Sequence, residues 1–125
     1  ISSLSHFLGY PGASSYAASK DGLAHFGKSL QKACPRMRIL RVFPGPIDTN
    51  HAKRYAPDNS AKAIGNRMDA DQAALIIWRS IERRHRTCVP GSSAKLGAFA
   101  GRVAPALMGR ILRRTLLDKM DRVRT

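Results

Sequence analysis

The chain has 125 residues, which is enough for one small domain. Its apolar content of 43% permits a globular core and argues against disorder as the default state. The net charge of +14 predicts an anionic partner, which is nucleic acid, a membrane surface or a phosphorylated ligand.

The N-terminal part of the chain predicts a strand, a loop and a helix. Residues 1–3 look like the end of a buried strand, and we expect the N-terminal part of a longer protein to precede them. The stretch HFLGYPGAS predicts a loop because it contains two glycines and a proline. Ser14 or Ser15 can cap the helix that follows, which should run from about residue 16 to residue 32 and end before Pro35.

Two further strand and helix pairs follow. Residues 37–43 (MRILRVF) predict a strand that ends at Pro44-Gly45, and residues 50–68 form a long polar excursion. The next helix should begin at Asp69 or Asp71 and end near residue 84. We expect its apolar side, facing the core or an interface, to hold Ala74, Ile77, Trp78 and Ile81. The stretch TCVPG predicts a third strand, and a last helical region covers about residues 94–118, interrupted by Pro105.

The order strand-helix-strand-helix-strand-helix predicts an α/β fold with a parallel sheet and helical crossovers. Ligand sites in such sheets lie beyond the carboxyl ends of the strands. Ser3, Pro44-Gly45 and the Pro90-Gly91 pair all fall at such ends. We therefore look for a site among the residues that follow the first two strands.

Tyr16 and Lys20 carry the chemistry that this edge suggests. Four helical residues turn the chain by roughly 400°, so the two side chains share one face of the helix. A free tyrosine has a pKa near 10, and a nearby ammonium group favours the phenolate form of a phenol. A tyrosine beside a lysine can therefore give or take a proton in the interconversion of a carbonyl and an alcohol. The hydride must come from a cofactor, because no side chain supplies one.

The ordered set of Ser3, Tyr16 thirteen positions later, Lys20 and then RVFPGPIDT resembles the short-chain dehydrogenase/reductase family. YxxxK alone is a weak signal, because a chain rich in basic residues produces it by chance. The ordered set is far more specific. The resemblance extends over essentially the whole chain, as the C-terminal half of that fold, and implies a partial Rossmann-like, doubly wound parallel sheet over residues 1–125.

This resemblance implies a role for each matching residue. Tyr16 would be the general acid/base, and Lys20 would favour its ionised form and hold the ribose hydroxyls of the nicotinamide nucleotide. Ser3 would orient the substrate carbonyl, although Ser2 and Ser5 are rivals by position. The remaining cofactor-binding residues would lie around the nicotinamide and are Pro44, Gly45, Ile47 and Thr49.

The resemblance also implies an NAD(P)-dependent oxidoreductase that acts on a small carbonyl or alcohol and forms a homo-oligomer at full length. The cofactor is NAD or NADP, with NADP favoured. The family's glycine-rich dinucleotide turn does not occur within these 125 residues, since no GxxxGxG is present. The chain therefore resembles the catalytic half of the fold without the cofactor-docking half, and an inactive truncated relic is an alternative.

The C-terminal tail predicts a different kind of function. Residues 79–125 hold twelve Lys/Arg and three acids, a net charge of +9. After Pro105 one side of a helical wheel is apolar, with Leu107, Met108, Ile111, Leu112 and Leu116. The opposite side carries Arg110, Arg113 and Arg114. This basic amphipathic tail predicts peripheral membrane contact or packing on the domain or a partner subunit. No aromatic interleaving or nucleic-acid motif supports nucleic-acid binding.

The cysteines and histidines predict no metal site. Cys34 and Cys88 stand in no zinc-ligand spacing and indicate reduced residues of a cytoplasmic protein. The histidines are scattered along the chain, and we interpret all four as non-catalytic. They are His6, His25, His51 and His85. No apolar run reaches the length needed to cross a bilayer.

Overall fold

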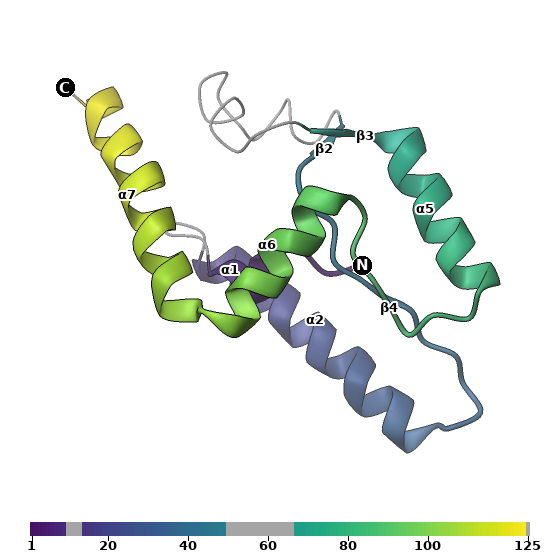
Figure 1. Ribbon diagram of the computed structural model, residues 1–125. Helices are drawn as coiled ribbons and strands as arrows, with labels where there is room; N and C mark the ends of the chain where they lie inside the picture. The colour runs from purple at the N-terminus through teal and green to yellow at the C-terminus, as the bar shows by residue number, and fades with distance from the viewer. Residues whose placement is uncertain (10–13, 50–66, 125) are drawn as a thin grey trace.

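The computed structural model describes residues 1–9, 14–49 and 67–124, with side chains up to residue 114. Within these ranges it is an α/β structure with two small parallel strand pairs. The elements in chain order are α1 (Ser5–Leu8), α2 (Ser14–Ala33), β1 (Arg41–Val42), β2 (Ile47–Asp48), β3 (Met68–Asp69), α5 (Ala70–Glu82), β4 (Thr87–Cys88), α6 (Ser92–Val103) and α7 (Pro105–Arg124) (Figure 1).

Strand β1 lies between β4 and the N-terminal segment. It pairs in parallel with β4, where Val42 stands opposite Cys88. On its other side, Ser2 N–H donates to Val42 O at 2.8 Å, and Leu4 N–H donates to Pro44 O at 2.9 Å. These alternating bonds are those of a parallel neighbour, although residues 1–3 do not form a regular strand. The expected parallel pairing is confirmed for β1 and β4, whereas residues 1–3 are not a strand and the strand expected over residues 37–43 is reduced to Arg41–Val42.

A second parallel pair, β2 with β3, was not expected from the sequence. Ile47 stands opposite Met68, and Met68 N–H donates to Pro46 O at 3.0 Å. Through this pairing, the chain just before α5 lies beside the segment that follows β1. Residues 50–66 of the expected polar excursion lie outside the described residues.

Helix α1 corrects the expectation of a loop over HFLGYPGAS. Residues 5–8 form one helical turn, and Gly9 ends it in the left-handed region at φ 55°. Gly9 N–H donates to Ser5 O at 3.1 Å, which satisfies a carbonyl that the helix end leaves open. The turn redirects the chain from the β1 edge toward α2.

Helix α2 begins earlier than predicted, because Ser14 and Ser15 lie inside it rather than before it. The residue that would cap it falls outside the described residues. Its end at Ala33, directly before Cys34-Pro35, agrees with the expected end because proline disfavours helical geometry in the residue before it.

Helix α5 begins as predicted, with Asp69 as its N-cap. The Asp69 carboxylate accepts hydrogen bonds from the N–H groups of Asp71 and Gln72 at 3.0 and 3.1 Å. The expected apolar side is partly wrong. The buried positions are Ala73 and Ser80, whereas Trp78 is 59% exposed and its indole N–H donates to Glu82.

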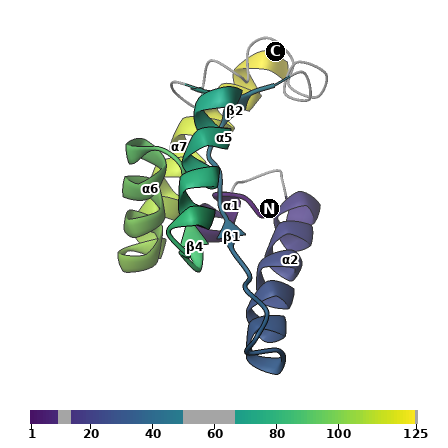
Figure 2. The ribbon, with the colours of Figure 1, turned by 90° about the vertical axis from the view of Figure 1, so that its right-hand side faces the viewer.

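The core lies between α1, the strand segments and α6. Leu4, Ala94 and Ala98 form its buried centre, and Phe7 packs against this centre. Phe43 is almost fully buried and its ring contacts Phe7. Figure 2 shows α6 at one edge of the molecule and α2 at the other, with β1 and β4 between them. The break between α6 and α7 falls at Ala104, directly before Pro105, as predicted.

Within the described residues, the helices include none whose length and apolar character would suit a membrane span.

Candidate functional site

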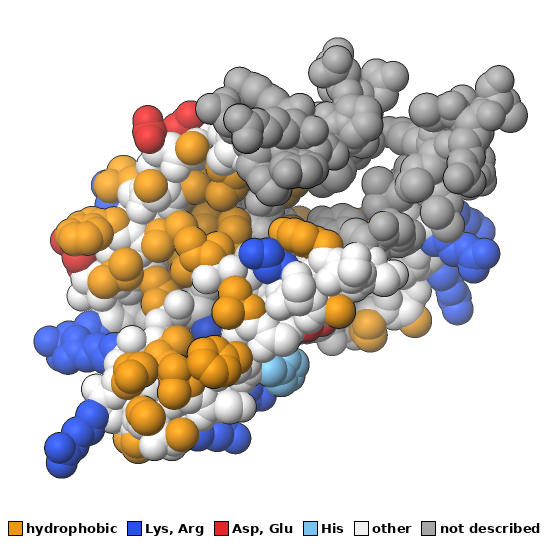
Figure 3. Space-filling model, turned by 180° about the vertical axis from the view of Figure 1, so that it is seen from behind, with side chains coloured by type: hydrophobic (Ala, Val, Ile, Leu, Met, Phe, Trp, Pro, Cys, Tyr) orange, Lys and Arg blue, Asp and Glu red, His pale blue; other side chains and the backbone are white. Residues whose placement is uncertain are grey.

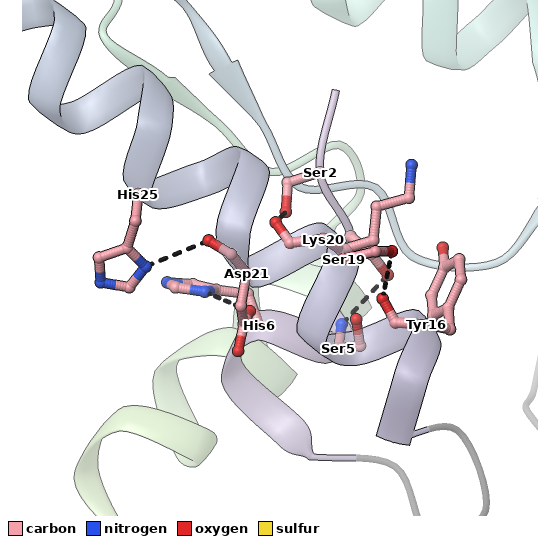
Figure 4. A network of polar contacts seen from close by, with 9 residues as sticks. Ser2, Ser5, His6, Tyr16, Ser19, Lys20, Asp21 and His25 are labelled. Atoms are coloured by element: carbon pink, nitrogen blue, oxygen red, sulfur yellow. Dashed lines mark hydrogen bonds and ion pairs between the residues drawn. The ribbon is translucent and has the colours of Figure 1, made fainter.

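Tyr16 and Lys20 lie one turn apart near the start of α2. Lys20 Nζ lies 5.8 Å from the centroid of the Tyr16 ring. Tyr16 is 48% exposed, and the Lys20 side chain is half-buried. In Figure 4 both side chains point to the same side of the helix, away from Asp21 and His25. A phenol hydroxyl and an ammonium group are therefore presented together to a ligand on this side.

Ser2 ties the N-terminal segment to this turn of α2. Its hydroxyl donates to the backbone carbonyl of Lys20 at 2.8 Å, and Ser2 is only 5% exposed. The same residue donates its N–H to Val42 O in β1. Ser2 therefore fixes the position of Lys20 relative to β1.

Ser3 lies between these contacts and is 9% exposed. Its Oγ accepts a hydrogen bond from Ser5 N–H at 3.2 Å, which leaves its own hydroxyl proton to donate. Of its two rivals, Ser2 already uses its hydroxyl on Lys20 O. Ser5 Oγ is buried and has no hydrogen-bond partner among the described residues.

His6 makes a second tie to α2. Its Nδ1 lies 2.7 Å from Asp21 Oδ1, and its ring stacks on Phe43 with 5.1 Å between centroids. His25 on α2 contacts His6 edge to face, and its Nδ1 lies 3.1 Å from Asp21 O (Figure 4). Contacts on both sides of Ser3 therefore reach consecutive residues of α2, namely Lys20 and Asp21.

The residues that follow β1 lie next to the N-terminal segment that contains Ser3. Pro44 O accepts from Leu4 N–H, and Ile47 lies in β2. A Cβ placed on Gly45 would lie 3.4 Å from the Ala94 Cβ and 3.7 Å from Leu4 Cδ2, so α6 packs closely over this residue. Thr49, the last described residue before the gap, is half-buried.

Hydrogen bonds made by Ser2 and Leu4, the two neighbours of Ser3, thus hold this segment against Lys20 O in α2 and against Val42 O and Pro44 O at the end of β1. Among the described residues, however, no hydrogen bond joins Ser3 to Tyr16 or to Lys20. No group of three or more His, Cys, Asp or Glu in the described part of the chain could hold a metal ion.

Sequence reasoning did not identify Ser2, His6 and Asp21 as the residues that position this region. Their partners lie 15 to 18 positions away, and no local pattern signals such contacts. One weak signal was available, because Asp21 directly follows Lys20 and His6 stands three positions after Ser3.

Replacing Ser2 by Ala should destabilise the protein by about 1 kcal/mol, because a buried hydrogen bond between the N-terminal segment and α2 is lost. Ser19→Ala is the matched control, since the Ser19 hydroxyl also donates to an α2 carbonyl, that of Tyr16, but in an exposed position. Urea unfolding of both variants measures the difference. Equal unfolding free energies for the two would contradict the proposed tie.

Comparison with known proteins adds one match. Residues 1–60, which contain every residue named in this section except Ala94, match the family model described as short chain dehydrogenase. No curated protein and no solved structure matches the chain.

Proposed function

We propose that the protein is an NAD(P)-dependent oxidoreductase that interconverts a carbonyl and an alcohol, and the match of residues 1–60 to the short chain dehydrogenase family model supports this proposal. The observation that carries the proposal is the pairing of the exposed Tyr16 with Lys20 Nζ, 5.8 Å from its ring centroid. The substrate class is a small carbonyl compound or the corresponding alcohol.

Tyr16 acts as the general acid/base in this proposal. Its hydroxyl donates a proton to the substrate oxygen during reduction and takes it back during oxidation. The positive charge of Lys20 stabilises negative charge on the phenol oxygen. Ser3 donates its hydroxyl proton in a hydrogen bond to the same substrate oxygen. This proton is available because Ser3 Oγ acts as an acceptor in its contact with Ser5 N–H.

The donors present fit a nicotinamide nucleotide in part. The ammonium group of Lys20 and the hydroxyl of Tyr16 are suited to ribose hydroxyls, and both lie on the accessible side of α2. We place Pro44, Gly45, the Ile47 backbone and the Thr49 hydroxyl around the nicotinamide, with NADP favoured over NAD. When bound, this cofactor supplies the hydride that no side chain can provide.

We further propose that residues 1–125 form the C-terminal part of a single Rossmann-like domain with a doubly wound parallel sheet. Parallel sheets are covered on both faces, and large apolar side chains here remain uncovered. Figure 3 shows them gathered over α5 and α2, on the face away from α6. The exposed residues on these two helices include Leu23, Phe26, Leu75, Trp78 and Ile81.

The variant Lys20→Met tests the proposal. Oxidation of reduced nicotinamide with a panel of aldehydes and ketones should slow at least about tenfold, because the charge that supports proton transfer is removed. Lys28→Met is the matched control, since Lys28 is an exposed lysine two turns further along α2. If both variants turned over at the wild-type rate, the result would contradict the proposed function.

A further inference from the structure

The outward side of α6 and α7 carries large apolar residues, and we call this surface the outer ridge. Its members range from 45% to 69% exposed. They are Leu96, Phe99, Val103, Leu107 and Ile111. Figure 1 shows that the chain turns sharply after α6 and that α7 then extends away from the strands.

Helix α6 packs on the protein through its smallest residues. Ala94, Ala98 and Gly101 are buried. Gly101 lies so close to α1 that an added Cβ would meet the Phe7 carbonyl oxygen. The helix therefore points its small side at the core and its large apolar side outward, the reverse of an ordinary surface helix.

Exposed lysine and arginine side chains lie on the same two helices as the ridge. Lys95, Arg110, Arg113 and Arg114 are exposed, and residues 92–114 contain no acidic side chain. The ion pairs among the described side chains lie elsewhere, between His6 and Asp21 and between Arg67 and Asp48. Arg102 is engaged with α1, where its guanidinium group lies 5.1 Å from the Phe7 ring centroid.

We propose that the outer ridge binds the surface of an anionic lipid membrane. Large aliphatic and aromatic side chains insert among the lipid chains just below the headgroups, while the four cations contact anionic headgroups. This inference is independent of the proposed oxidoreductase activity. A second copy fits less well, because a self-pairing would bring these cations against one another. Nucleic acid offers no apolar phase for the ridge.

The experiment is co-sedimentation of the protein with vesicles of phosphatidylcholine alone or mixed with phosphatidylserine, at low and high salt. We expect binding to the mixed vesicles, weak binding to the neutral ones, and weaker binding at high salt. Each cation near the surface contributes roughly fivefold to the partition coefficient. Arg110→Glu/Arg113→Glu/Arg114→Glu should therefore lower it more than about a hundredfold.

The matched control is Arg83→Glu/Arg84→Glu/Arg86→Glu, which reverses three exposed arginines after α5 and leaves the same net charge. It should retain most of the binding. Equal losses in both triple variants would mean attraction by net charge alone and would overturn the proposal. Equal binding to neutral and anionic vesicles would also overturn it.

A second pair of variants tests the apolar part of the ridge. Leu96→Ser/Phe99→Ser should lower binding at least about tenfold, whereas Leu75→Ser/Trp78→Ser, which removes exposed apolar residues from α5, should not. Circular dichroism of each variant shows that the fold is retained. Tighter binding to RNA or DNA than to anionic vesicles, or loss of binding in the α5 pair alone, would reject the ridge as a lipid-binding surface.

Discussion

Replacing Tyr16 by Phe should lower turnover of the protein about 10²- to 10⁴-fold, which is the usual contribution of a general acid. The change removes a single oxygen from a residue that is 48% exposed, so the fold should be retained. The ring remains in place beside Lys20, so the ammonium group keeps the position from which we propose that it binds the ribose hydroxyls. Cofactor binding, measured by titration of reduced nicotinamide fluorescence, should weaken far less than turnover, since the Tyr16 hydroxyl is lost while the Lys20 ammonium group remains.

The control is Ser19→Ala, which removes a hydroxyl from the same turn of α2 and should leave turnover near wild type. The double variant Tyr16→Phe/Lys20→Met adds a sharper test. Residues that act as one unit show strongly non-additive effects, so the double variant should be little slower than Tyr16→Phe alone. Multiplied losses would mean that Lys20 acts independently of Tyr16, and unchanged turnover in Tyr16→Phe would refute the mechanism.

The long helices of this fold were predictable from the sequence because their signals are local. Asp69 stands where an N-cap is needed, and Pro35 and Pro105 mark positions that a helix does not cross undisturbed. These signals depend on residues next to one another in the chain. The start of α5, the end of α2 and the break before α7 were accordingly predicted to within a few residues.

The short elements were not predictable in the same way. Helix α1 has four residues, too few to show a helical period. Its place depends on Gly101, nearly a hundred positions away, which allows α6 to approach the Phe7 carbonyl. The pairing of β2 with β3 likewise joins residues on the two sides of the gap at 50–66.

For the candidate site, the sequence indicated which side chains could transfer a proton, but it did not indicate the contacts that position them. The helical spacing of Tyr16 and Lys20 follows from the chain itself. The contacts that set the height of α2 against the strands, from Ser2 to Lys20 and from His6 to Asp21, cross between segments and leave no periodic signal. The sequence also did not indicate which side of α6 faces the core, because glycine and alanine are weak indicators of burial.

Gly101→Ala should destabilise the protein by about 1–3 kcal/mol, the usual cost of overpacking a close contact. A Cβ at this position would clash with the Phe7 carbonyl oxygen, and it would lie 3.0 Å from the carbonyl carbon and 3.1 Å from Leu8 Cδ2. Two of these three atoms belong to the backbone of α1, so a rotamer change cannot relieve the clash. Helix α6 must move away from α1 and reduce the burial of Ala94 and Ala98.

Gly97→Ala is the matched control, one turn earlier on the same helix. A Cβ there would meet Leu8 Cδ1 at 3.7 Å, an ordinary contact. Alanine favours an α-helix over glycine by up to about 1 kcal/mol, so this variant should be neutral or slightly more stable. Urea unfolding of the two variants thus gives opposite signs if α6 packs on α1 through its small residues. A stabilising effect at both positions would show that α6 does not lie against the Phe7 carbonyl, and the outward direction of the ridge would then lose its structural basis.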